Sequence, residues 1–135
     1  MSAEAIIRLN SEPAVRLAGI ELRDCLAKAT GRTLSVLDRK RYAPDRPAVW
    51  LGLFSDFPEV EADGDGADAD AYLVRVGADG GIVAGTNARS VLLGVYRYLT
   101  ELGFRWVRPG ADGEFVPAQA QVDVGAIAVT LRRPR

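Results

Sequence analysis

The side chains available for chemistry in this chain are mostly carboxylates, because its 135 residues include no histidine and a single cysteine, Cys25. Histidine is the commonest general base and a usual zinc ligand, so its absence removes Ser–His and Cys–His nucleophile pairs and the common zinc sites. Cys25 falls on the apolar side of a predicted helix, which favours a buried structural thiol over a nucleophile. Hydrolysis would therefore have to depend on paired carboxylates.

Carboxylates gather in two places along the chain. Asp112 and Glu114 are close in sequence and near an aromatic residue, and such a pair could in principle hydrolyse a glycosidic bond. They fall on a predicted turn without a second aromatic platform, so we interpret them as surface residues. The acidic segment 59–70 suggests calcium, but the stretch from Asp63 departs from the EF-hand pattern at its fifth, sixth and twelfth positions. A solvated loop is favoured there, and calcium binding stays open.

Two glycine-containing segments resemble phosphate-binding loops only superficially. Residues 77–81 lie between two predicted strands, whereas a phosphate-cradling loop runs from a strand into a helix. Gly85-Thr86-Asn87 does precede a predicted helix, but a single glycine without a lysine favours helix capping over anion binding. The sequence thus assigns no catalytic, metal-binding or cofactor-binding residue.

Overall charge argues against nucleic acid or an anionic membrane as a partner. The chain has 17 basic and 18 acidic residues, for a formal net charge of -1. No stretch approaches the roughly 18 apolar residues of a membrane span, and no signal peptide is visible at the start. Taken as written, the chain is expected in the cytoplasm, unless it was cut from a longer protein. Arg132, Arg133 and Arg135 are interpreted as a solvated tail.

Apolar spacing predicts two helices. The first spans about 12–30, with Ser11 as its cap, Pro13 in its first turn and Gly31 just past its end. The second follows Thr86-Asn87 and ends at Gly103. Gly94 lies mid-helix on the apolar side, and close approach to a strand would explain it. The apolar positions of the two helices are Val15, Ala18, Leu22, Cys25, Leu26 and Ala29, and then Val91, Leu92, Val95, Tyr98, Leu99 and Leu102.

Short β-rich runs surround these helices. They cover 5–9, 33–37, 48–53, 71–76, 82–84, 104–107 and 114–116. In the run 48–53 the residues on both faces of the strand are apolar, which is typical of an inner strand that is covered on both faces. Together the elements predict one α+β domain, with a small mixed sheet, two helices on one face and the order β-α-β-β-β-β-α-β.

An ordered series of motifs resembles a known family. It contains Leu93-Gly94-Val95-Tyr96-Arg97-Tyr98-Leu99, the step Gly103-Phe104-Arg105-Trp106, and Pro109-Gly110-Ala111-Asp112-Gly113-Glu114-Phe115-Val116-Pro117. The series resembles the non-catalytic N-terminal α/β domain of glycoside hydrolases such as alpha-glucuronidases and bacterial beta-N-acetylhexosaminidases. It covers nearly the whole chain, although Ser90 stands where the family often has glycine.

This resemblance implies that residues 1–135 form a single accessory domain that supports a catalytic barrel in the same polypeptide. The catalytic carboxylates of such enzymes lie in the barrel, so the domain alone is not expected to be an enzyme. In the relatives a segment like 131–135 leads into the first barrel strand, so we expect an excised domain or a gene that kept only the accessory part.

The alternative is a stand-alone carbohydrate-binding module, with carbohydrate as the partner. Trp50, Phe104 and Trp106 could form a platform on which a sugar stacks, with Arg105 beside them. Core packing, or contact with a following domain, explains the same residues. No cofactor is implied by either interpretation.

Overall fold

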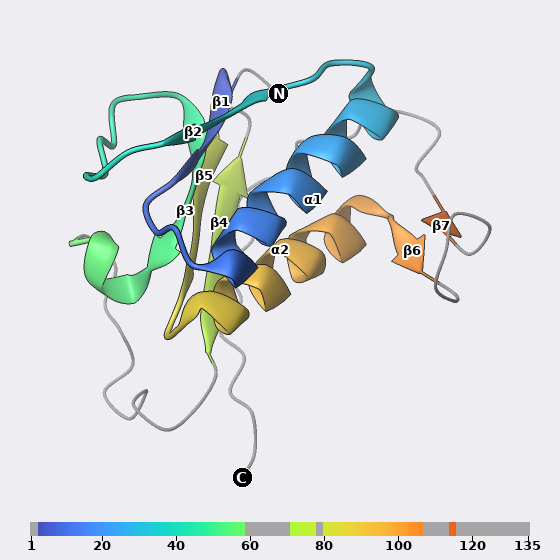
Figure 1. The fold of residues 1–135 in the computed structure, drawn as a ribbon. Helices are drawn as coiled ribbons and strands as arrows, with labels where there is room; N and C mark the ends of the chain where they lie inside the picture. Colours follow the sequence, from blue (N-terminus) through green and yellow to red (C-terminus); the bar gives the residue numbers. More distant parts are fainter. Residues whose placement is uncertain (1–2, 59–70, 78–79, 107–113, 116–135) are drawn as a thin grey trace, which may run out of the picture.

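The computed structural model describes residues 3–58, 71–77, 80–106 and 114–115. A five-stranded sheet in the order β2-β1-β3-β5-β4 forms its centre, with the first four of these strands parallel and β4 antiparallel to β5. Two helices lie side by side on one face of this sheet (Figure 1). The sheet strands are β1 (Ala5–Arg8), β2 (Ser35–Asp38), β3 (Ala48–Leu53), β4 (Tyr72–Gly77) and β5 (Gly80–Gly85).

The remaining elements are the two helices, a 3₁₀ turn and two short strands. They are α1 (Pro13–Thr30), the 3₁₀ turn η1 (Phe54–Asp56), α2 (Ala88–Leu102), β6 (Arg105–Trp106) and β7 (Glu114–Phe115). The predicted fold class and element order are confirmed, and the two extended segments expected after α2 pair with each other as the antiparallel ribbon β6–β7. The β4–β5 pairing likewise confirms a hairpin around residues 77–81.

The start of α1 differs from its prediction. Ser11 is not the cap: the helix is preceded by Glu12, and no side chain caps the first turn. Pro13 explains the shift, because it occupies the first turn and a residue before proline is held in an extended conformation. Glu12 adopts that conformation, with φ −63° and ψ 149°. Asn10 orders the approach instead, since its Oδ1 accepts the Glu12 N–H at 2.7 Å.

Both helices end as predicted, and α2 begins as predicted. Asn87 caps α2, because its Oδ1 accepts the backbone N–H of Ser90 at 2.8 Å and the hydroxyl of the same residue at 3.0 Å. Gly31 and Gly103 follow the helices with φ of 73° and 111°, a left-handed conformation that a side chain disfavours.

The helices and the sheet enclose the larger of two hydrophobic clusters, here called the helix-face cluster. α1 contacts β1, β2 and β3, and α2 contacts β5, β4 and β3. Alternate residues of β3, Val49 and Leu51, point into this cluster. Its other fully buried members are Ala3, Ile6, Val15, Ala18, Leu22, Val74, Val83, Val91, Val95, Tyr98, Leu99 and Phe104.

A second cluster covers the opposite face of the sheet, and we call it the crossover-face cluster. Residues 39–47, which we call the crossover, connect β2 to β3, and Tyr42 and Ala43 from this segment pack against the cluster that contains Trp50. Tyr42 meets Trp50 and Phe57 edge to face, at ring-centroid distances of 5.2 and 4.9 Å. The expectation that β3 is covered on both faces is therefore confirmed, with a loop rather than a helix on the second face.

Strand boundaries shift by a few residues from those expected. β2 begins at Ser35 rather than Thr33, because parallel pairing with β1 starts where Ala5 meets Ser35. β5 begins at Gly80, two residues earlier than expected, since it pairs with the full length of β4. Leu34 is still buried although it precedes β2.

Gly94 lets α2 lie close to the sheet, and this gives a first prediction. A Cβ at position 94 would lie 2.7 Å from Cγ1 of Val83 and 3.3 Å from Cβ of Tyr72. We expect Gly94→Ala to lower the free energy of unfolding by about 1–2 kcal/mol, because overlap with a well-packed strand outweighs the gain of roughly 1 kcal/mol in helix propensity. Urea denaturation of the purified variant measures this change.

Two further variants test whether overlap with Val83 causes the loss of stability. Thr100→Ala, at an exposed position of the same helix, should change the unfolding free energy by no more than about 0.5 kcal/mol. In a Val83→Ala background the cost of Gly94→Ala should shrink, because the overlapping methyl group is gone. A Gly94→Ala protein that is more stable than the original would contradict the close approach.

Candidate functional site

The outer side of α1 carries exposed apolar side chains. Leu17 and Ile20 are 42% and 40% exposed, and they are the exposed large hydrophobic residues of the described part of the chain. Their spacing of three places them on one side of the helix, away from the buried positions that face the sheet. Polar residues Arg16, Asp24 and Lys28 are exposed on the same helix. The pair is thus an apolar spot within a charged helix surface.

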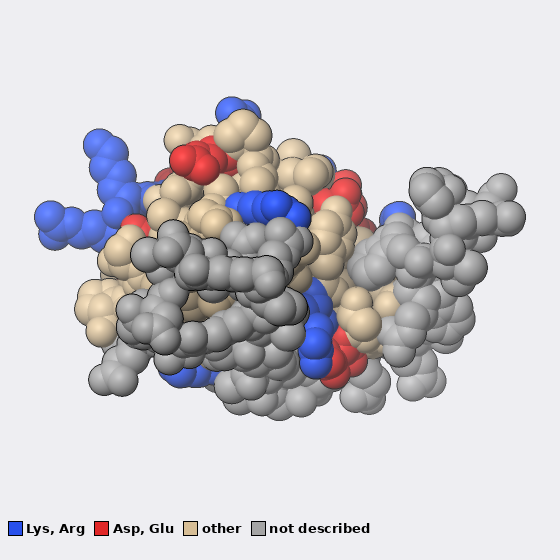
Figure 2. All heavy atoms as spheres, turned by 90° about the horizontal axis from the view of Figure 1, so that it is seen from below, with Lys and Arg blue, Asp and Glu red and all other residues tan. Residues whose placement is uncertain are grey.

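A pocket of about 460 Å³ lies where β1 and β2 end. We call it the Arg8 pocket, and it is lined by Arg8, Leu9, Asn10, Ser11, Asp38, Arg39 and Lys40. Seen from below the orientation of Figure 1, basic side chains project beyond the edge of the molecule on the side where β2 ends (Figure 2). The pocket therefore combines strand ends, the segment that leads into α1, and positive charge.

Arg8 holds the wall of this pocket together. Its Nε and one terminal nitrogen donate to the two carboxylate oxygens of Asp38 at 2.9 and 3.0 Å, which is a bidentate ion pair between neighbouring strands. Its other terminal nitrogen lies 3.5 Å from the Arg16 carbonyl oxygen in α1. The Arg8 side chain is 12% exposed and Asp38 is 65% exposed, so the ion pair is shielded on one side only.

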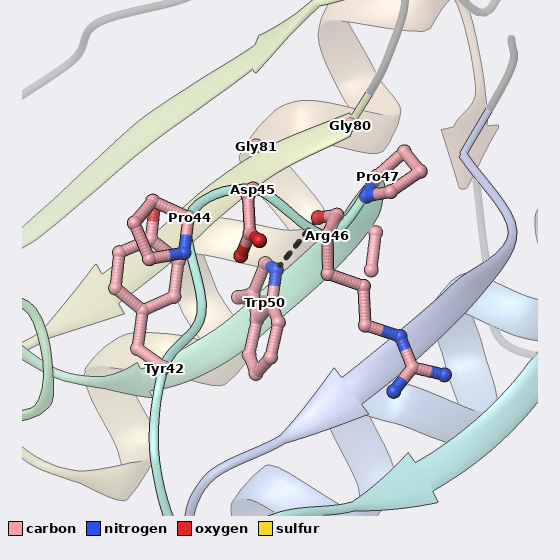
Figure 3. Close-up of a pocket in the computed structure, with 9 residues that line it drawn as sticks. Tyr42, Pro44, Asp45, Arg46, Pro47, Trp50, Gly80 and Gly81 are labelled. Atoms are coloured by element: carbon pink, nitrogen blue, oxygen red, sulfur yellow. Dashed lines mark hydrogen bonds between the residues drawn. The ribbon is translucent and has the colours of Figure 1, made fainter.

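A second pocket, of about 360 Å³, lies at the amino ends of β3 and β5 (Figure 3). We call it the Trp50 pocket, and it is lined by Tyr42, Pro44, Asp45, Arg46, Pro47, Ala48, Trp50, Gly80 and Gly81. Trp50 donates its indole N–H to the Arg46 carbonyl at 3.4 Å, a long hydrogen bond, and only 2% of the residue is exposed. The indole is chiefly a core group that anchors the crossover.

The four aromatic and basic residues singled out for sugar or inter-domain contact do not meet as one described surface. Phe104 is fully buried in the helix-face cluster, whereas Trp50 belongs to the crossover-face cluster on the other side of the sheet. Arg105 and Trp106 form β6, and their side chains lie outside the described residues.

The structure also places the carboxylate and thiol candidates. Glu114 is part of β7, whereas Asp112, the acidic segment 59–70 and the tail from 116 lie outside the described residues. Cys25 is buried in the helix-face cluster, as expected for a structural thiol. Within the described residues, no three His, Cys, Asp or Glu side chains come together as a metal site. Neither helix of that part of the chain combines the length and apolar character that crossing a membrane needs.

The phenol of Tyr96 on α2 has a perturbed acidity. Burial raises the pKa of Tyr96 above its usual value of 10.0, and the nearby Glu21 and Cys25 add to the shift by disfavouring a negative phenolate. The Tyr96 hydroxyl, on α2 beside α1, therefore stays neutral throughout the physiological range.

Two features of the site were not predicted from the sequence. The Arg8–Asp38 pair joins residues 30 apart in the chain, and nothing in their local sequence marks them as partners. Leu17 and Ile20 could have been found, because both interrupt the polar side of a helix whose apolar side is otherwise well defined.

Comparisons with known proteins give a likeness to solved structures but match no family model. No family model matches the chain, and no curated protein matches it. Among solved structures it is similar to the GH20 beta-N-acetylhexosaminidase from Streptomyces coelicolor A3(2), with 20% sequence identity over 95% of this chain and a TM-score of 0.47. The chain spans 22% of the length of that enzyme chain.

The geometry of the Arg8 pocket gives a second prediction. Arg8→Lys keeps the charge but removes the two-pronged contact with Asp38, so we expect it to lower the free energy of unfolding by about 1–2 kcal/mol. Arg97→Lys is the matched control, since Arg97 pairs with Glu101 at 2.8 Å on an exposed helix surface. That change should cost no more than about 0.5 kcal/mol. Equal losses in the two variants, measured by urea denaturation, would show that the partial burial of Arg8 has no effect.

Proposed function

We propose that this chain is a non-catalytic accessory domain of a glycoside hydrolase, related to those of alpha-glucuronidases and beta-N-acetylhexosaminidases, and that its helix layer packs against the catalytic barrel of the same polypeptide. The motif series from residue 93 to 117 supports the family part of this proposal, together with a fold of the class that the resemblance implies. In this proposal the domain supports the catalytic barrel and holds it in position, and the barrel carries out the reaction.

The observation that carries the docking face is the exposure of Leu17 and Ile20 on α1. The crossover and the 3₁₀ turn cover the other face of the sheet, so the helix layer is the described face that presents large apolar groups. Completing the burial of two such side chains, each about two-fifths exposed, would add roughly 1–2 kcal/mol to the association of the two domains. Exposed Arg16, Asp24 and Lys28 would form the polar rim of that contact.

The proposal is tested on the protein that the full reading frame encodes. Hydroxyl-radical footprinting should modify Leu17 and Ile20 strongly in the isolated chain, and several-fold less in the parent protein, because the barrel covers both side chains. A reading frame without a barrel-length sequence of alternating strands and helices would contradict the proposal. So would equal modification in the two proteins.

A charge-introducing variant separates docking from folding. Leu17→Glu/Ile20→Glu should leave the unfolding free energy of the isolated chain within about 0.5 kcal/mol per site, because both positions face solvent there. In the parent protein it should let this domain melt separately from the barrel, which differential scanning calorimetry detects. Ser35→Glu/Ser55→Glu adds the same charge at exposed positions outside α1 and α2 and should leave a single joint transition.

A further inference from the structure

We infer that the Arg8 pocket binds a small molecule through an oxyanion group, a carboxylate or a phosphate, with Arg39 and Lys40 as the main contacts. The inference rests on the topology, charge and hydrogen-bond donors of the pocket, and it does not depend on the proposed accessory role. The crossover-face aromatic residues take no part in it.

The topology opens a crevice at this place. β1 and β2 are neighbouring parallel strands, and their carboxyl ends meet at the same edge of the sheet. The chain leaves β1 towards α1 on the helix face, whereas it leaves β2 into the crossover, whose Tyr42 packs on the opposite face. In open α/β sheets, ligands bind outside the carboxyl ends of the strands, and this pocket lies at that edge, between the ends of β1 and β2.

The charge of the crevice selects the ligand. Three cationic side chains and one carboxylate line it. The carboxylate of Asp38 is already engaged by both prongs of Arg8, so the charge that a ligand meets comes from Arg39 and Lys40. One terminal nitrogen of Arg39 donates to the Asp38 carbonyl at 2.8 Å, which holds the guanidinium at the rim and leaves further N–H groups for an incoming oxygen.

Two uncharged residues that line the same pocket add hydrogen-bond donors. Asn10 uses its Oδ1 to accept the Glu12 N–H, and this fixes the side-chain NH₂ as the group left to donate. Ser11 lines the same pocket, and its hydroxyl does not cap α1, the role expected from the sequence. N–H and O–H donors beside two cations suit a carboxylate or a phosphate group.

The size of the pocket indicates more than a bare ion. About 460 Å³ lies within the usual range of roughly 300–1,000 Å³ for small-molecule sites, so the oxyanion would be one end of a larger ligand. Leu9 supplies an apolar wall against which the uncharged part of such a ligand can rest.

Three chemically matched probes test the inference by NMR titration of the chain. Glycerol 3-phosphate and glycerate carry the two candidate oxyanions, and glycerol carries neither. We expect saturable shifts of backbone amides at residues 8–11 and 38–40 with at least one anion below about 20 mM, and none with glycerol. The anion that binds more tightly identifies the group, and stronger binding at lower salt is expected because the contacts are exposed.

Matched charge variants decide whether the pocket is responsible. Lys40→Gln and Arg39→Gln should each weaken binding about five- to tenfold, since each removes a charged contact. Arg75→Gln removes the same charge from an exposed position on β4 and should leave the affinity within about twofold. The inference is overturned if neither anion gives saturable shifts at residues 8–11 and 38–40. It is also overturned if glycerol binds equally well, or if Arg75→Gln weakens binding as much as Lys40→Gln.

Discussion

The burial of β3 on both of its faces is the constraint on which the rest of this molecule depends. Val49 and Leu51 point into the helix-face cluster, and Ala48 and Trp50 point into the crossover-face cluster. A strand that is apolar on both sides is stable only if something covers each side. Two helices cover one face, and the crossover with Tyr42, together with the 3₁₀ turn, covers the other.

The close approach of α2 and the path of the crossover both follow from this requirement. Gly94 allows the α2 backbone to reach Val83 on β5, the strand next to β3. On the other face, Tyr42 lies edge-on to Trp50 and Phe57. Nine crossover residues and a single 3₁₀ turn therefore cover that face of β3 without a helix. Because the connections from β1 and β2 depart to different faces, the Arg8 pocket forms between them.

The same architecture determines where function can reside. With the crossover covering one face, the large apolar side chains that remain exposed in the described residues are on α1, and the proposed barrel contact is assigned there. The charged pocket lies instead at the carboxyl edge of the sheet. The two surfaces are made by different side chains, although they adjoin where Arg8 reaches the Arg16 carbonyl of α1.

Local chemistry made much of the fold predictable from the sequence. The apolar spacing located both helices, the Asn87 cap and Gly103 marked the ends of α2, and the two-sided apolar pattern of residues 48–53 identified an inner strand. The Ser11 cap was wrong because Pro13 shifted the start of the helix by one residue.

Contacts between distant parts of the chain were harder to predict. The Arg8–Asp38 pair depends on which strands become neighbours, and the covering of Trp50 by Tyr42 depends on the path of the crossover. Neither follows from periodicity or from local sequence. The side chains of Arg105 and Trp106, expected in an inter-domain or sugar contact, lie outside the described residues and stay a prediction.

Native-state hydrogen exchange of the isolated chain tests the central claim most directly. If burial of β3 on both faces organises the fold, the hydrogen-bonded amides of β3 and its neighbours β1 and β5 should exchange only through global unfolding. The amides of the edge strands β2 and β4 should then exchange at least about tenfold faster, through local opening. Exchange of β3 amides as fast as those of β2 and β4 would contradict the account.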